Sequence, residues 1–427
     1  MYWRPGSERR IRNPKNTQRM VHMEKKVYLV GARRSPIGKY LGSLKDIHPV
    51  DLGVRVLKEL LKTTKVPTDK ISEVIVGNIL SAGIGQGIAR QISIKSGIPE
   101  SIPAYSLNMV CGSGMKAIMN GFNAIQSGFD DIVVAGGVES MSQAPYLVSG
   151  KIRFGVKMGD INLVDHMIKD SLTDAFGDMH MGITAENVAE KYGITREEQD
   201  EFSLKSQQKA IEAVDSGRFD DEIVPIEIKM KKETFIFDKD EFPNRTTNTE
   251  KMAKLRPAFK EGGTVTAGNS SGINDGASFT IVASEEAVKE SNLPVMAEII
   301  AIGQGGVDPA YMGLGPVPAI KNALKSANMG LDEIELIELN EAFAAQSLEV
   351  VNELAEEYKV SKTDILAKTN VNGGAIALGH PVGASGNRIV VTLIHEMIKR
   401  NLKYGLAALC IGGGMGTAVI LKREEGK

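Results

Sequence analysis

The chain has 427 residues, which is too long for one small core and predicts two or three domains. Apolar residues make up 42% of it and charged residues 24%, as in ordinary globular proteins. The formal net charge of −2 excludes a general attraction to nucleic acids or membrane surfaces, and no apolar run is long enough to cross a bilayer. The only two cysteines, Cys111 and Cys410, exclude a disulfide framework and favour a reducing compartment such as the cytoplasm.

The N-terminal 22 residues differ from the rest, because they are rich in arginine and carry Glu8 as their single acid. A basic, acid-poor segment is typical of a transit peptide, but Pro5 and Pro14 oppose the amphipathic helix that such a peptide forms. We therefore expect residues 1–25 to be a disordered basic tail, with the transit peptide as the alternative.

From Lys26 onward, short apolar runs alternate with segments of helical periodicity. The pattern predicts strands over 27–30, 71–79, 104–110 and 131–135, and helices over 50–61 and 115–125. The last of these strands is expected to end at Gly136-Gly137. This alternation predicts an α/β fold with a mostly parallel sheet that is covered on both faces.

The C-terminal third repeats this order. A strand over 336–339 precedes a helix that reaches about residue 357, and a helix over 388–399 precedes a strand over 406–410. In each half a Ser-Gly step opens a helix, and an apolar run that ends in consecutive glycines follows it. This weak self-similarity indicates an internal duplication.

Residues 143–265, between the halves, are richer in charge and methionine. Thr195 and Glu198 have the spacing of a capping box and predict a helix that reaches about Val214. We interpret this region as a loop domain inserted over the sheets, where α/β proteins commonly build binding sites. The predicted domains are residues 26–142 for the N-terminal half, 143–265 for the loop domain, 266–295 for the return to the N-terminal half and 296–427 for the C-terminal half.

Cys111 lies between a predicted strand and a predicted helix, in Asn108-Met-Val-Cys-Gly-Ser-Gly114. The amide end of a helix favours the thiolate, which is the nucleophilic form, and the glycines leave room for a bulky thioester. Cysteine is also among the most buried and inert residue types. The pattern around Cys111 alone therefore leaves both interpretations open.

Three other residues of the C-terminal half could take part in the same chemistry. His380 stands beside proline in a glycine-rich turn, where an imidazole could accept a thiol proton or be satisfied by backbone groups. Cys410 ends an apolar run before three glycines, whose amides could stabilise an oxyanion. Asn340 could orient a water molecule or an oxyanion, or it could simply cap a helix. The two cysteines end matching segments of similar halves, which favours a joint chemical role.

Nucleotide and metal sites are not indicated by the sequence. It contains no G-x-x-x-x-G-K-[ST] motif, and no G-x-G-x-x-G follows the first strand with an acidic partner downstream. The histidines and cysteines do not cluster at the spacing of metal ligands.

Five motifs in chain order resemble those of the thiolases, and the likeness extends from about Lys26 to Lys422. These motifs are Asn108-Met-Val-Cys-Gly-Ser-Gly114, Gly136-Gly-Val-Glu-Ser-Met141, Asn340-Glu-Ala-Phe343, Gly379-His-Pro-Val-Gly-Ala-Ser-Gly386 and Cys410-Ile-Gly-Gly-Gly-Met-Gly416. The resemblance implies a duplicated thiolase fold of two related βαβ halves, in five layers α-β-α-β-α, with an inserted loop domain. It also implies a homotetramer or, less often, a dimer.

The resemblance assigns roles by position. Cys111 looks like the acylated nucleophile, His380 its activating base, and Cys410 the base that removes the Cα proton of a second acetyl-CoA. His380 and a water held by Asn340 would form one oxyanion hole, and the backbone amides of Cys111 and Gly412 the other. The implied reaction is a ping-pong Claisen condensation of two acetyl-CoA molecules to acetoacetyl-CoA and CoA, with no cofactor besides these CoA substrates.

The inserted region resembles the CoA-binding loop domain of the thiolases. By this resemblance His180, Met181 and Ser271 are expected to contact pantetheine, and Arg245 is expected to lie near the adenine nucleotide. Lys251 stands where the pattern of the family has a serine, which puts one contact with CoA in doubt.

The sequences Cys-Gly-Ser-Gly and Gly-Ala-Ser-Gly resemble the acetoacetyl-CoA branch, acetyl-CoA C-acetyltransferase. With Met181, Met312 and Phe343 as a tight acyl pocket, we expect a preference for acetyl-CoA and acetoacetyl-CoA. A 3-ketoacyl-CoA thiolase of broader chain length is an alternative, and so is a decarboxylating ketoacyl synthase. The non-enzymatic alternative is an acyl-CoA-binding or redox-responsive protein in which the two cysteines merely pair.

Overall fold

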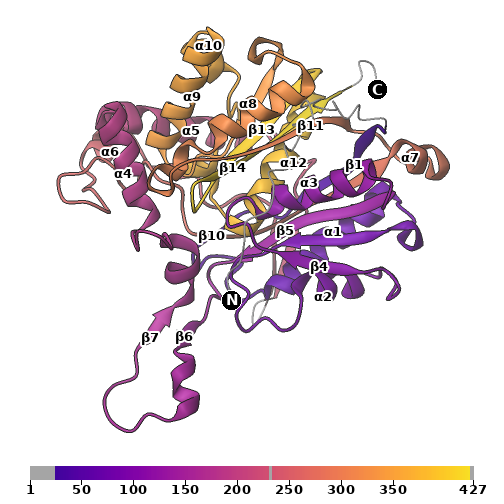
Figure 1. Ribbon diagram of the computed structural model, residues 1–427, viewed down its shortest axis with the longest axis horizontal. Helices are drawn as coiled ribbons and strands as arrows, with labels where there is room; N and C mark the ends of the chain where they lie inside the picture. The colour runs from indigo at the N-terminus through magenta and orange to yellow at the C-terminus, as the bar shows by residue number, and fades with distance from the viewer. Residues whose placement is uncertain (1–24, 230–232, 424–427) are drawn as a thin grey trace, which may run out of the picture.

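The computed structural model describes residues 25–229 and 233–423, so the predicted tail lies outside the described residues except for Lys25. One large sheet dominates the fold (Figure 1). Its strands are β1 (Val27–Arg34), β2 (Gly38–Lys39), β3 (Glu73–Gly77), β4 (Ala104–Leu107), β5 (Ile132–Ser140), β10 (Asn274–Ser284), β11 (Ala297–Gly306), β12 (Leu336–Leu339), β13 (Tyr404–Ile411) and β14 (Met415–Lys422). Their order is β12-β13-β14-β11-β1-β10-β5-β3-β4, and β2 pairs with β10.

Two central helices lie between the N-terminal and C-terminal parts of this sheet, as Figure 1 shows. These helices, α3 (Ser113–Gln126) and α12 (Val382–Arg400), contact each other, and α12 also contacts strands of both parts. The outer faces are covered by α1 (Pro49–Thr64) and α2 (Ile88–Lys95) on one side, and by α8 (Pro316–Ala327) and α9 (Ala344–Tyr358) on the other. The predicted α-β-α-β-α layering is therefore confirmed.

The sequences of the helices fit these layers. Helix α12 is buried along its whole length from Val382 to Met397, as expected for a helix that packs against a sheet on either side. Helix α1 buries only one face, and the His48 side chain accepts a hydrogen bond from the Val50 amide at its start. Lys65 ends α1 in the left-handed conformation.

The prediction of a mostly parallel sheet was wrong. Strand β3 is parallel to β4 and to β5, and β12 is parallel to β13, but the other neighbouring strands are antiparallel. Strands β10 and β11 return the chain through the middle of the sheet, and a turn at Gly412–Gly414 joins β13 directly to β14. Apart from the β13–β14 hairpin, these antiparallel pairings join segments far apart in sequence, so local periodicity could not reveal them.

The predicted end of β5 was also wrong, because the strand continues through Gly136-Gly137 to Ser140. A Cβ atom on Gly137 would lie 2.0 Å from the carbonyl oxygen of Gly383 in α12, and one on Gly136 would lie 2.2 Å from Phe279. The two glycines therefore allow close packing within the strand and do not end it.

In its described residues, 143–229 and 233–265, the inserted region contains three α-helices and two separate two-stranded sheets. The elements are β6 (Tyr146–Val148), β7 (Leu163–Asp165), α4 (Met181–Tyr192), α5 (Arg196–Asp215), β8 (Ile226–Lys229), β9 (Thr234–Phe237) and α6 (Thr249–Ala253). The remaining helices are α7 (Glu285–Ser291), α10 (Lys362–Ala367) and α11 (Ala375–Leu378). The capping box predicted at Thr195 and Glu198 is present at the start of α5. Strands β6 and β7 form an arm that projects from the body (Figure 1).

Candidate active site

A strained turn carries Cys111 between β4 and α3. Val110 has a φ of 45°, which is rare for a β-branched residue. The Ser113 hydroxyl accepts a hydrogen bond from the Met109 amide at 2.8 Å and donates to the Val110 carbonyl at 2.7 Å. The Val110 amide donates to Asn108 Oδ1 at 2.9 Å. Backbone strain of this kind persists only where the surroundings enforce it, and it is common at functional sites.

Two glycines let this turn approach the C-terminal half of the chain. A Cβ atom on Gly112 would lie 2.3 Å from Ile411 Cδ1, and Ile411 directly follows Cys410. A Cβ atom on Gly114 would lie 2.7 Å from the backbone nitrogen of Asn387 in α12. The absence of side chains at these positions therefore brings the Cys111 turn against the two C-terminal motifs.

Cys111 and Cys410 come from the two halves of the chain and are close enough for Cys111 to affect the pKa of Cys410. Burial raises the pKa of the Cys111 thiol to about 11, although hydrogen bonds from the backbone amides of Gly412 and Cys111 act in the opposite direction. Burial, together with the neighbouring Cys111, raises the pKa of the Cys410 thiol well above its ordinary value. The backbone amides favour the Cys111 thiolate, as expected, but desolvation has the larger effect and raises the pKa of the thiol overall.

The raised pKa predicts how Cys111 reacts with iodoacetamide. Only the thiolate is alkylated, and a shift from 9.0 to about 11 lowers the thiolate fraction at pH 7 by about 100-fold. Between pH 6 and 10 the alkylation rate should therefore rise about tenfold for each pH unit without a plateau. Peptide mass spectrometry gives the rate at each pH, with Cys111→Ala as the blank. A plateau below pH 8 would contradict the expected thiol.

Hydrogen bonds assign the tautomer of His380. Its backbone amide donates to Asn274 Oδ1 at 2.9 Å, and its Nδ1 lies 2.6 Å from Ser385 Oγ. The Ser385 hydroxyl donates to the Pro381 carbonyl at 2.9 Å, so it is left to accept a hydrogen bond from Nδ1–H. Among the described residues, the buried Nε2 has no hydrogen-bond partner. Burial, with a smaller effect of the Arg388 charge, lowers the pKa of His380 to about 3, so Nε2 is an unprotonated acceptor.

Asn340 follows β12 and lies against His380, with its Nδ2 3.5 Å from the imidazole Nδ1. Its backbone amide donates to the Ala408 carbonyl at 3.0 Å, and its side chain is buried. Helix α9 begins only at Ala344, with Phe343 at the N-cap, so Asn340 does not cap this helix. Within the described part of the chain, Asn340 Oδ1 has no hydrogen-bond partner, which suits a group that binds water or substrate.

Apolar side chains surround Cys410. The cluster includes three residues of the predicted acyl pocket and CoA site, Met181, Met312 and Phe343. His180 caps α4 by accepting a hydrogen bond from the Gly182 amide at 3.0 Å, and its ring stacks on Phe259 at 4.7 Å. Phe259 also packs on this cluster. Because His180 stacks on Phe259, the structure places His180 beside the predicted pocket residues around Cys410.

The other predicted CoA contacts are less closely grouped. The Ser271 amide donates to the Ala342 carbonyl at 2.9 Å, so Ser271 lies beside the turn that follows Asn340. Arg245 forms an exposed ion pair with Asp215, with nitrogen–oxygen distances of 2.8 and 2.6 Å. Lys251 of α6 is exposed, and its ammonium group donates a hydrogen bond to the Thr246 carbonyl just before this helix. Arg245 and Lys251 are not part of the cluster around Cys410.

The sequence analysis assigned no role to Glu139, although this residue lies in one of the five motifs. The buried carboxylate accepts hydrogen bonds at 3.0 to 3.1 Å from the Asn78 side chain and from the backbone amides of Ile79, Leu80 and Gly383. Burial raises the pKa of Glu139 to about 7, while the amides act in the opposite direction. Glu139 therefore ties the loop after β3 to the first turn of α12, three residues after His380.

Residues 25–229 and 233–423 contain no group of three or more His, Cys, Asp or Glu side chains that could hold a metal ion. In the same residues no helix combines the length and apolar character needed to cross a membrane. Both cysteines are free thiols.

Comparison with known proteins shows the family of the chain. The model of the thiolase N-terminal domain matches residues 27–286, and that of the thiolase C-terminal domain matches residues 293–423. An acetyl-CoA acetyltransferase from Pseudomonas aeruginosa is 53% identical over 399 residues, which covers 93% of this chain and 99% of that protein.

Solved structures share the fold over most of the chain. Acetyl-CoA acetyltransferase from Syntrophomonas wolfei has a TM-score of 0.91 at 43% identity, covering 94% of this chain and 100% of that one. Human mitochondrial 3-ketoacyl-CoA thiolase in complex with CoA has a TM-score of 0.88 at 45% identity, covering 94% of this chain and 98% of that one. Both thiolase domain models match, and relatives align along nearly the full length, so the chain belongs to the thiolase family of acyltransferases.

Proposed function

We propose that this protein is an acetyl-CoA C-acetyltransferase, which reversibly joins two acetyl-CoA molecules to acetoacetyl-CoA and CoA. The observation that carries this proposal is the interaction of Cys111 with the Gly412 amide and with Cys410. The Asn340–His380 pair comes from the same half of the chain as Cys410. The names of the relatives in Pseudomonas and Syntrophomonas support acetyl-CoA as the substrate. We propose no cofactor besides the CoA thioesters.

In the first half-reaction, His380 Nε2 takes the proton of Cys111 while the sulfur attacks the thioester carbonyl. The pKa of the thiol is raised and that of the imidazole is lowered, so the resting pair is uncharged and proton transfer accompanies attack. The backbone amides of Cys111 and Gly412 stabilise the tetrahedral oxyanion. CoA leaves with the proton of Cys410, and the products are acetylated Cys111, an imidazolium and the Cys410 thiolate.

In the second half-reaction, the Cys410 thiolate removes a Cα proton from a second acetyl-CoA. The Nε2–H group of His380 and a water held by Asn340 stabilise the enolate oxygen. The enolate carbon then attacks the acetyl group, and the Cys111 thiolate that leaves takes the proton of the imidazolium. All groups thereby return to their starting protonation, and the reverse sequence is thiolysis.

Mass spectrometry after incubation with acetyl-CoA tests this proposal. We expect a single acetyl group on Cys111 of the full chain and the appearance of acetoacetyl-CoA. The Cys111→Ala variant should show neither product. An intact protein that binds acetyl-CoA without acetylation of Cys111 would contradict the proposal and favour an acyl-CoA-binding protein.

The preference for short acyl chains is part of the proposal. Met181, Met312 and Phe343 pack closely around Cys410 and restrict the space for an acyl group. Thiolysis should therefore be fastest with acetoacetyl-CoA and should fall steeply by the C10 3-ketoacyl-CoA. Likeness to human 3-ketoacyl-CoA thiolase supports the alternative of a broader range, and equal rates at C4 and C10 would establish that alternative.

We also propose that the protein is a cytoplasmic homotetramer. The β6–β7 arm exposes large apolar side chains, among them Phe154 at 87% and Met158 at 95% exposure. Exposed apolar patches of this kind are typical of contacts between proteins, and two free thiols suit a reducing compartment. Light scattering should give four chains for the intact protein and fewer for Met158→Asp. A monomeric intact protein would contradict the proposed assembly.

A further inference from the structure

A short strip just after the inserted region, residues 269–271, pairs with the turn that carries Asn340. The Ser271 amide donates to the Ala342 carbonyl at 2.9 Å, and the Ala344 amide donates to the Asn269 carbonyl at 2.9 Å. The residues between these bonds form an antiparallel bridge. Because Ala342 is only two residues from Asn340, the position of the strip influences where the Asn340 side chain lies.

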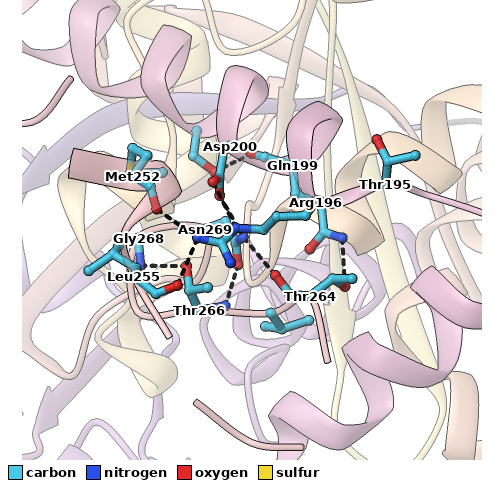
Figure 2. A network of polar contacts seen from close by, with 12 residues as sticks. Thr195, Arg196, Gln199, Asp200, Met252, Leu255, Thr264, Thr266, Gly268 and Asn269 are labelled. Carbon is cyan, nitrogen blue, oxygen red and sulfur yellow. Dashed lines mark hydrogen bonds and ion pairs between the residues drawn. The ribbon is translucent and has the colours of Figure 1, made fainter. Parts of the chain in front are cut away.

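A buried polar network holds the side chain of Asn269 (Figure 2). Its Nδ2 donates to Asp200 Oδ1 at 2.9 Å and to the Thr264 carbonyl at 3.1 Å. Its Oδ1 accepts a hydrogen bond from the Thr266 amide at 2.7 Å. Both amide protons and the amide oxygen are therefore used, which leaves the side chain a single orientation.

Arg196 anchors the far end of this network, as Figure 2 shows. Its Nε donates to Asp200 Oδ2 at 2.7 Å, one turn along α5, and the two side chains are only 19% and 12% exposed. Its Nη2 donates to the carbonyls of Met252 and Leu255 at 2.6 and 3.0 Å. Arg196 therefore joins α5 to the end of α6. Asp200 accepts hydrogen bonds from both Arg196 and Asn269 and so links the two side chains.

We propose that Asn269 is a positioning residue for the oxyanion hole at Asn340, with Arg196 and Asp200 fixing its orientation. This inference rests on the proposed function. Asn269 acts through its backbone, because its carbonyl accepts a hydrogen bond from the turn that follows Asn340. Its side chain forms hydrogen bonds with the inserted region. A continuous series of hydrogen bonds leads from the Arg196–Asp200 ion pair through Asn269 to the segment that follows Asn340.

The two half-reactions depend differently on this network. Acetylation of Cys111 uses the amides of Cys111 and Gly412, which lie in other segments of the chain. Both half-reactions use His380, but only enolate formation uses Asn340. Loosening the strip should therefore slow condensation much more than acetylation, whereas general damage to the fold would slow both alike.

The variant Asn269→Ala tests this difference. We expect kcat for acetoacetyl-CoA formation to fall about 10- to 100-fold, as is typical when a group that orients a functional residue is removed. The rate of Cys111 acetylation by acetyl-CoA should stay within about threefold of the wild type, because its oxyanion hole is unchanged. Rapid quenching followed by mass spectrometry measures acetylation, and acetoacetyl-CoA absorbance measures condensation.

Two further variants keep the test independent of the stability of Asn269→Ala. Asp200→Asn replaces one carboxylate oxygen with an amide group. It should also slow condensation much more than acetylation, because the new NH₂ group would face a donor of either Asn269 or Arg196. Ser203→Ala removes a buried hydroxyl that bonds only within α5, and it serves as the matched control with both rates unchanged.

Proportional loss of both rates in Asp200→Asn, or unchanged condensation in Asn269→Ala, would overturn the inference. The wild-type protein separates this failure from failure of the proposed function. A wild-type Cys111 that is never acetylated contradicts the proposed function itself. A wild-type protein that is acetylated and condenses, beside an Asn269→Ala variant that condenses equally well, contradicts only the role of Asn269.

Discussion

Replacing Cys410 by serine should lower the rate of acetoacetyl-CoA formation about 10³-fold, within the range that removal of a general base produces. The hydroxyl of serine is a far weaker acid than a thiol, so at neutral pH it supplies almost no base to take the Cα proton. The buried position of Cys410 strengthens this expectation, because burial already raises the pKa of the thiol and would disfavour an alkoxide further.

The same variant should still become acetylated on Cys111, although more slowly, because CoA can leave as a thiolate without an acid. Acetylated protein should therefore accumulate in Cys410→Ser and be visible as a stable mass increase. Circular dichroism should match the wild type, since the two side chains differ by one atom. Condensation at the wild-type rate would instead indicate a decarboxylating synthase, which does not need a second cysteine.

Replacing Glu139 by glutamine should lower the free energy of unfolding by about 2–4 kcal/mol, because buried hydrogen-bond donors lose their partners. The carboxylate accepts hydrogen bonds at both oxygens. A glutamine keeps only one oxygen, and its amide group would face amide donors on the other side. Urea unfolding at pH 8, where a carboxyl group with a pKa of about 7 is ionised, measures the difference.

Glu349→Gln provides the matched control for this experiment. Glu349 is also buried, but among the described residues it accepts a hydrogen bond only from Asn352 Nδ2, at 2.9 Å, and glutamine can accept it equally well. We expect a change below about 0.5 kcal/mol there, as for substitutions that leave no donor unpaired. An equally small change in Glu139→Gln would show that the loop after β3 does not depend on the carboxylate.

The sequence by itself determined the features that depend on a few neighbouring residues. The capping box at Thr195, the helix that follows it and the strand over 336–339 were predicted because capping groups and apolar periodicity are local signals. The motifs around Cys111 and His380 were visible for the same reason. They could indicate the chemistry because a nucleophile and a base keep their chemical character in any fold.

Only the tertiary structure decided how these groups are paired and charged. The antiparallel strands β10, β11 and β14 depend on partners from other parts of the sheet, and Gly137 of β5 faces α12. The Cys111 thiol keeps its proton because of burial, which a helix end considered alone does not reveal. Asn269 and Asp200 are 69 positions apart, so hydrogen bonding between them depends on the fold that brings them together.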